Sequence, residues 1–269
     1  MAKYGLDSIH NTVLLSHGGA GKTSLAEAIM FNTGVVSRLG KVDDGSSMSD
    51  YDPDEIKRKI SINLSLLPCE WNENKLNILD TPGYTDFVGE VKAGMRVSEG
   101  AVITVCATSG IEVGTELVWG YCNESNLPRL VFVNKMDREN ADYGKVVDEI
   151  RARLSNKCVP LQVPIGAASG FEGVVDLLTM KAYTGVGQDA KEADIPDAVK
   201  AQADSFREML IESVAEIDDT LIEKYLGGED ITAQELATTL KKAVKSGSIY
   251  PILAGSALQN IGVNRLADA

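Results

Sequence analysis

Eight consecutive residues near the start of the chain combine glycines, a lysine and a threonine in an order that suits phosphate binding. They read Ser16-His17-Gly18-Gly19-Ala20-Gly21-Lys22-Thr23, which is the pattern G-x-x-x-x-G-K-[ST] with serine at its first position. Glycines let several backbone N–H groups turn toward one anion, and the start of a helix adds the positive end of its dipole. We expect the Lys22 ammonium to bridge the β- and γ-phosphates of a nucleotide and the Thr23 hydroxyl to hold Mg²⁺.

This segment and the residue after it are therefore predicted to contact a nucleotide. The expected contacts come from His17, Gly18, Gly19, Ala20, Gly21, Lys22, Thr23 and Ser24. Two interpretations of His17 stay open. In the first, its side chain contacts a phosphate or a switch segment. In the second, the side chain packs aside and only the backbone of His17 helps to bind the phosphates. The alternative for the whole segment is a chance glycine-rich turn, which its place between a predicted strand and a predicted helix disfavours.

A second motif, Asp80-Thr81-Pro82-Gly83, follows a predicted strand. The Asp80 carboxylate at the end of that strand can hold Mg²⁺ through water. The Gly83 N–H can approach a γ-phosphate because glycine has no side chain to block it. An ordinary turn is the alternative, since proline and glycine are common turn residues.

Two later motifs predict recognition of guanine. Asn134-Lys135-Met136-Asp137 follows the next-but-one predicted strand, and the Asp137 carboxylate can accept from both N1–H and N2–H₂ of guanine, a donor pair that adenine lacks. Asn134 can tie loops together, and the Lys135 stem can lie over the base. The weaker motif Gly255-Ser256-Ala257-Leu258 follows the last strand, and the N–H groups of Ser256, Ala257 and Leu258 can read guanine O6. The order of the motifs favours GTP over ATP.

The segments that must position these motifs alternate between strand and helix. Strands are expected at residues 12–15, 60–67, 75–79, 101–106, 130–133 and 249–253. Helices are expected at residues 22–31, 86–97, 112–123 and 143–154, and residues 33–58 are expected to form a polar loop. The uninterrupted apolar run 101–106 is typical of a parallel strand covered on both faces. The pattern predicts an α/β fold, a P-loop NTPase with a doubly wound, mostly parallel sheet flanked by helices.

Residues 158–248 break this alternation and are predicted to form an inserted α+β subdomain. Strand-like runs at 159–165 and 173–176 come first, then a long helix whose apolar positions repeat at three and four residues over 206–221. Thr232 and Glu235 form a capping box that starts another helix, and the acidic stretch 189–197 is expected to be a solvated loop. The main domain is then expected to comprise residues 1–157 and 249–269.

Composition restricts the function further. The net charge of −13 argues against a broad basic surface for nucleic acid. No apolar run approaches the ~18 residues of a membrane span, and the first residues lack the apolar stretch of a signal peptide. The four cysteines are scattered without C-x-x-C, and two histidines make a zinc site improbable. We expect a reduced, cytoplasmic, monomeric protein.

With these motifs in order, the chain resembles the GTPase domain of translational GTPases, and among them elongation factor G. Thr81-Pro82-Gly83 with Asp86-Phe87 matches the family's D-T-P-G-H-x-D-F, and Arg58-Lys59-Ile60-Ser61-Ile62 takes the place of its R-G-I-T-I. Pro164-Ile165-Gly166-Ala167 and the stretch from Phe171 to Leu177 are similar to that factor's insert, which elongation factor Tu lacks. The resemblance implies a GTP/GDP cycle with Mg²⁺ held by Thr23, Ser61 and Asp80. It also implies switch movements in residues 38–65 and 80–97, action on the ribosome, and further domains in a longer protein.

Three positions depart from the family pattern. Tyr84 stands where the family has the histidine that orients the attacking water, and a phenol of pKa ~10 is a poor base. Gly19 replaces the usual P-loop aspartate, and Ser61 replaces the switch threonine. We expect Tyr84, Lys22 and Gly83 to serve hydrolysis. The alternatives are a nucleotide-sensing binding module with negligible turnover, and a release-factor or ribosomal-protection relative.

Overall fold

The computed structural model describes residues 4–269, so residues 1–3 of the expected domain 1–157 lie outside the described residues. A seven-stranded sheet forms the centre, in the order β2-β3-β1-β4-β5-β11-β6. All neighbours pair in parallel except β2, which is antiparallel to β3. The strands are β1 (Ile9–Leu15), β2 (Ser65–Trp71), β3 (Asn74–Asp80), β4 (Gly100–Cys106), β5 (Arg129–Asn134), β6 (Cys158–Pro160) and β11 (Tyr250–Ala254).

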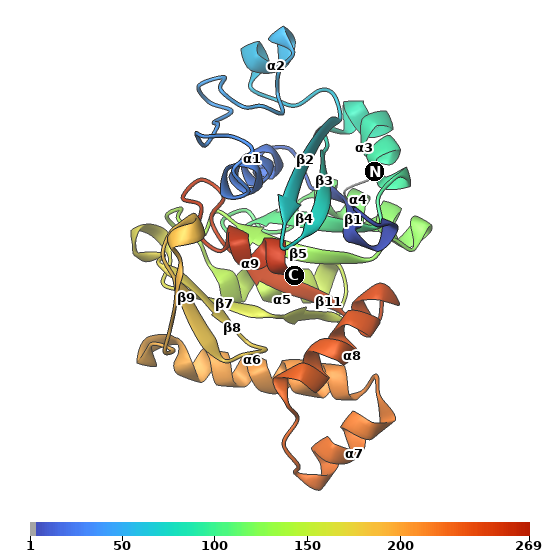
Figure 1. Cartoon of the computed structure of the whole chain (residues 1–269), viewed down its shortest axis with the longest axis vertical. Coiled ribbons are helices and arrows are strands. Elements are labelled where there is room, and N and C mark those ends of the chain that lie inside the picture. The colour runs from blue at the N-terminus through green and yellow to red at the C-terminus, as the bar shows by residue number, and fades with distance from the viewer. Residues whose placement is uncertain (1–3) are drawn as a thin grey trace.

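Helices cover both faces of this sheet (Figure 1). Alternate strand residues divide between two apolar cores: Leu14 and Phe132 enter one, whereas Val13 and Val131 enter the other. The first core includes side chains of α1 (Lys22–Asn32), α8 (Ala233–Lys245) and α9 (Val263–Asp268). The second includes side chains of α3 (Val88–Arg96), α4 (Val113–Ser125) and α5 (Tyr143–Arg153). The predicted α/β class with a mostly parallel sheet is confirmed.

A smaller antiparallel sheet in the order β10-β9-β8-β7 lies beside β11, with helices below it (Figure 1). Its strands are β7 (Gln162–Ile165), β8 (Gly173–Asp176), β9 (Lys181–Thr184) and β10 (Lys191–Ala193). The helices are α6 (Asp197–Ala215), α7 (Asp219–Gly227) and α8, and the 3₁₀ turns of the chain are η1 (Leu6–Ser8), η2 (Thr85–Phe87), η3 (Ala168–Gly170) and η4 (Gly187–Asp189).

Several expected elements differ from those observed. The run 159–165 is two strands in two sheets, because β6 pairs with β11 in the large sheet, so the small sheet starts only at Gln162. The helix expected over 206–221 is broken between α6 and α7, because the Asp218 side chain accepts from Thr220 N and Leu221 N and starts a new helix. The acidic stretch includes β10, whose backbone pairs with β9 while its side chains stay exposed.

The alternation over 60–67 also misled the strand prediction, because β2 begins only at Ser65. The N–H groups of Ile62 and Asn63 donate to the Glu55 carboxylate, so they are not available to a neighbouring strand. Within the expected loop 33–58 the structure forms a short helix, α2 (Pro53–Arg58), started by an Asp52–Glu55 capping box. Among the described residues, no helix is both long and apolar enough to cross a bilayer.

Gln162 links the two sheets, which gives a test of their docking. Its side-chain oxygen accepts from Ala254 N at 3.2 Å, and its carbonyl accepts from the Tyr143 hydroxyl at 2.7 Å. Replacing Gln162 with Leu leaves the buried Ala254 N–H without that acceptor, so we expect the free energy of unfolding to fall by about 1–3 kcal/mol. Urea denaturation measures this. The exposed Gln234→Leu is the control, expected within about 0.5 kcal/mol of the parent; equal losses in both variants would contradict the assignment.

Candidate functional site

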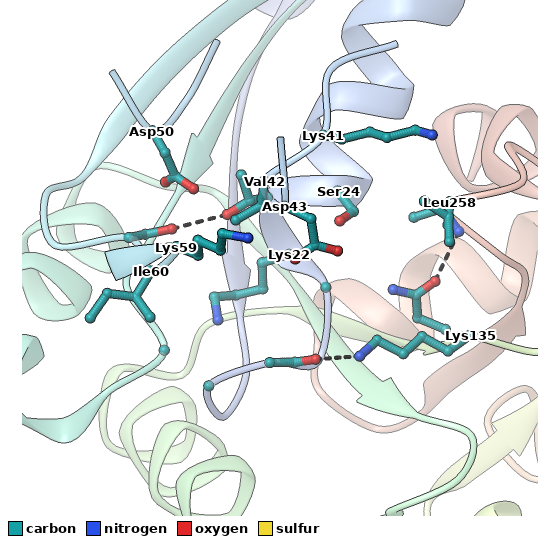
Figure 2. Close-up of a pocket in the computed structure, with 18 of the residues that line it drawn as sticks. Lys22, Ser24, Lys41, Val42, Asp43, Asp50, Lys59, Ile60, Lys135 and Leu258 are labelled. Atoms are coloured by element: carbon teal, nitrogen blue, oxygen red, sulfur yellow. Dashed lines mark hydrogen bonds between the residues drawn. The ribbon is translucent and has the colours of Figure 1, made fainter. Parts of the chain in front are cut away.

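The predicted motifs meet at one edge of the large sheet. The loops that carry the motifs follow β1, β3, β5 and β11. These strands are parallel, so the loops emerge at the same edge of the sheet, at the carboxyl ends of the strands. There they line a pocket of about 350 Å³ together with the loop that precedes β2. Figure 2 shows Lys135 and Leu258 on one side of this pocket and Asp50, Lys59 and Ile60 on the other. The predicted residues that line it are Gly18, Gly19, Gly21, Lys22, Thr23, Ser24, Ser61, Gly83, Tyr84, Asn134, Lys135, Asp137, Ala257 and Leu258.

The Lys22 ammonium lies buried within the turn after β1. It donates to Ser16 Oγ at 3.0 Å and to the His17 carbonyl at 3.3 Å, and burial lowers its pKa to about 8. Gly83 packs against this turn so closely that a Cβ there would lie 2.7 Å from both Gly18 Cα and Lys22 Nζ. The lysine and the backbone of Gly83 therefore converge on one point, as binding of a terminal phosphate requires.

The third and fourth motifs close on the first through Asn134. Its amide nitrogen donates to the Ala20 carbonyl at 3.0 Å, and its oxygen accepts from Ala257 N at 2.9 Å. Lys135 Nζ donates to the Gly19 carbonyl at 2.6 Å. Asp137 accepts from the Ser256 hydroxyl at 2.6 Å. The structure thus brings the predicted phosphate and base motifs together, and Ser256 lies behind Asp137, outside the pocket lining.

Oxygen ligands for a cation gather beside Thr23. The Thr23 and Ser61 hydroxyls lie 3.0 Å apart. Asp80 accepts from the Ser49 hydroxyl at 2.6 Å through one oxygen, and its other oxygen, like both oxygens of Asp50, is buried without a hydrogen-bond partner among residues 4–269. Burial raises the pKa of Asp80 and raises that of Asp50 to about 6. Hydroxyl and carboxylate oxygens are what Mg²⁺ prefers, so the residues present fit this ion.

Asp50 is a residue that sequence reasoning missed. It lies in the polar segment 33–58, and no motif or spacing singles it out. Only the folded loop places this buried carboxylate near Ser61 and Asp80, in the pocket that Thr23 also lines.

The comparisons with known proteins agree with this geometry. The family described as "Elongation factor Tu GTP binding domain" matches residues 7–269. The chain belongs to this family. It is a domain of the translational GTPases, and binding of a guanine nucleotide is a property of this family.

A solved relative extends the comparison. The chain is similar to a protein of known crystal structure from Thermus thermophilus, with 32% sequence identity and a TM-score of 0.90. The match covers 97% of this chain and 39% of that one, so the chain spans about two fifths of the length of this relative.

Two positions of this translational GTPase domain have side chains with distinct surroundings. The buried His17 ring points away from the pocket: Nδ1 lies 2.9 Å from Thr115 Oγ1, and Nε2 lies 3.1 Å from a Glu112 oxygen. Of its two interpretations, the structure shows the one in which the side chain packs aside. The half-exposed Tyr84 ring instead lies over the turn between β1 and α1, 3.1 Å from where a Cβ on Gly18 would stand.

Two buried glutamates hold the segment 40–63, parts of which line the pocket. Glu27 of α1 accepts from Ser47 Oγ at 2.9 Å, Met48 N at 2.6 Å and Ser49 N at 3.2 Å. A Cβ on Gly40 would lie 2.3 Å from the other Glu27 oxygen, so glycine lets the loop close over this carboxylate. Glu55 organises the following stretch through Ile62 N and Asn63 N. These contacts hold Asp50 and Ser61 in place beside Thr23.

Removing the Glu27 carboxylate should loosen this segment. In Glu27→Ala the Met48 N–H and the Ser47 hydroxyl lose their acceptor, so we expect more frequent local opening. Trypsin should then cleave after the exposed Lys41, Lys57, Arg58 and Lys59 on the order of tenfold faster. Mass spectrometry of timed digests measures the rates. The exposed Glu124→Ala is the control, and unchanged cleavage in Glu27→Ala would contradict the role given to Glu27.

Proposed function

We propose that the chain is the GTP-binding and GTP-hydrolysing domain of an elongation-factor-G-like translation factor that acts on the ribosome in translocation. The observation that supports nucleotide binding is the junction at Asn134. Its carboxamide joins the turn at residues 16–23, here called the phosphate turn, to the loop at residues 255–261, here called the base loop. Support for the ribosome part comes from the family, from the longer Thermus relative and from the insert. We propose that the protein is located in the cytoplasm and is a monomer, and that this domain reaches the ribosome as part of the full-length protein.

The base would bind between Asp137 and the loop after β11. Asp137 retains acceptor capacity beyond its bond from Ser256, so it can accept from guanine N1–H and N2–H₂. Within the loop at Ser256–Leu258 the Leu258 N–H would face O6, because Ser256 N donates to the Ile261 carbonyl and Ala257 N donates to Asn134 Oδ1. The Lys135 stem would lie along the base. The phosphates would occupy the turn at residues 17–24, to which His17 contributes its backbone.

Mg²⁺ would be held by Thr23, Ser61 and Asp80, with the Asp50 carboxylate beside them. When bound, the ion would neutralise charge on the β- and γ-phosphates. The protein's own share is positional. The Ser49 hydroxyl orients Asp80, and the contacts of the loop with Glu27 hold Ser49 and Asp50 near Asp80.

For hydrolysis, Lys22 would stabilise charge that develops on the γ-phosphate, and the Gly83 N–H would contact the same oxygens. The Tyr84 hydroxyl would orient the attacking water as a hydrogen-bond donor and acceptor. Its part would be to hold the water in position, not to remove a proton from it. Phosphoryl transfer depends mainly on position and charge, so this is compatible with turnover.

A second candidate is a switch that holds GTP and recruits a partner with negligible turnover. The Tyr84 ring favours it, because it lies against the phosphate turn where the family has histidine. We further propose that residues 161–248 act as an inserted subdomain. Residues 1–157 and 249–269 then form the main domain, to which the strand at 158–160 also belongs.

Base recognition is tested by exchanging the Asp137 carboxylate for an amide. Asp137→Asn should weaken GTP binding by at least ~100-fold and improve xanthosine triphosphate binding, because the amide N–H₂ opposes guanine N2–H₂ but can donate to xanthine O2. Titration calorimetry with both nucleotides measures this, and the exposed Asp148→Asn is the control. Equal affinity of parent and variant for GTP would contradict the proposed base site.

The role of Tyr84 is tested by turnover of the full-length protein with and without ribosomes. Without stimulation we expect about 10⁻⁴ s⁻¹. Tyr84→His should raise stimulated turnover, because an imidazole can also accept a proton, whereas Tyr84→Phe should lower it at unchanged GTP affinity. If Tyr84→His leaves turnover unchanged, this position does not set the rate. Tight GTP binding by a parent that ribosomes do not stimulate favours the switch.

A further inference from the structure

The base loop has a second set of contacts on the side away from the nucleotide pocket. Ser256 and Ile261 exchange two backbone hydrogen bonds, at 2.9 and 3.0 Å, and close the loop into a tight turn. Asn260 lies within this turn in the left-handed region, with φ +56°, which asparagine tolerates better than most residues. Only 2% of its surface is exposed. The residue three positions from the pocket-lining Ala257 is thus fully enclosed.

Asn260 forms a reciprocal amide pair with Asn32, the last residue of α1. Asn32 Nδ2 donates to Asn260 Oδ1 at 2.8 Å, and Asn260 Nδ2 donates to Asn32 Oδ1 at 2.6 Å. Asn32 is equally buried. Lys22 and Thr23 lie at the opposite end of the same helix. The pair therefore connects the base loop to the helix that carries the phosphate-binding residues.

The inserted subdomain closes over this pair through the turn between β9 and β10. Gly187 N donates to the Asn260 carbonyl at 2.7 Å, Asn264 Nδ2 donates to the Gly187 carbonyl at 2.7 Å, and Gln188 Nε2 donates to the Asn32 carbonyl. Gly187 has φ +52°, and a Cβ there would lie 2.6 Å from Asn260 Nδ2 and 2.9 Å from Asn32 Oδ1. No other residue fits at this position without displacing the amide pair.

We propose that Asn32, Asn260 and Gly187 are positioning residues through which the inserted subdomain fixes the base loop and so sets how long and how selectively a guanine nucleotide stays bound. The inference rests on the proposed nucleotide site. None of the three residues touches the nucleotide pocket. Their effect passes through the backbone of the turn 256–261, in which Ala257 N donates to Asn134 Oδ1 and Leu258 N would face the base.

The test uses the whole chain and fluorescent GDP. Dissociation is followed by stopped flow for the parent, Asn32→Ala and Gly187→Ala, together with competition by GDP and by inosine diphosphate, which lacks the 2-amino group. We expect both variants to release GDP on the order of tenfold faster, since each leaves buried amides without partners. We also expect a smaller preference for GDP over inosine diphosphate, which a loss of stability alone would not produce.

The matched control is Gly228→Ala. Gly228 also has a left-handed φ, of +71°, and lies in the inserted subdomain, but no atom lies within 4 Å of its Cβ position. It should leave dissociation unchanged. Gln188→Ala changes only an exposed side chain, so it should fold normally and give a smaller effect in the same direction even if Gly187→Ala does not fold.

The outcomes separate the two proposals. If the parent binds no GDP, the proposed nucleotide site fails. If the parent binds GDP but Asn32→Ala and Gln188→Ala release it at the parental rate with the parental base preference, only the positioning role is overturned. An equal acceleration by Gly228→Ala would also overturn it, because strain anywhere in the insert would then suffice.

Discussion

The two hydrogen bonds of the buried Asn134 carboxamide are the interaction on which the site depends. One side chain at the end of β5 satisfies a carbonyl of the phosphate turn and an N–H of the base loop, 114 and 123 residues away along the chain. The constraint extends to its neighbours. Gly21 must be glycine because a Cβ there would lie 2.5 Å from Asn134 Nδ2. Lys135 and Asp137 follow Asn134 in the same loop, and they contact the Gly19 carbonyl and the Ser256 hydroxyl. The spacing between the proposed phosphate and base positions is thus set by a single amide held by a central strand.

Buried charge is the second feature of the site, and it is only partly compensated within the chain. Burial lowers the pKa of Lys22 and raises those of Asp50 and Asp80, because in each case the low-polarity surroundings disfavour the ionised form. Isolated buried charges are destabilising. The proteins that retain them commonly use them at functional sites. A polyanion and a divalent cation, as proposed here, would supply opposite charges at these positions.

The sequence predicts the parts whose physics is local. Uninterrupted apolar runs identified β4 and β5, and the glycines identified the turn between β1 and α1, because both signals lie within a few residues. The misread segments depend on distant partners. Residues 60–64 alternate like a strand, yet Glu55 and Glu90 take their N–H groups. Asp50 carries no local signal, since its importance comes from Asp80 and Thr23, which reach it only through the fold. The same holds for Asn32, whose partner is 228 residues away.

The inserted subdomain is connected to the base loop in two ways, through the chain and through a hydrogen bond. β11 begins at Tyr250, soon after α8 ends at Lys245, and the base loop follows β11 immediately. The covalent connection alone would let the loop rotate about the end of its strand. The contact from Gly187 to Asn260 adds a second attachment on the far side of that loop. A loop attached at both sides loses less conformational freedom on binding, so it binds its ligand with a smaller entropic penalty. The insert therefore acts on nucleotide affinity from a position where none of its residues needs to reach the nucleotide.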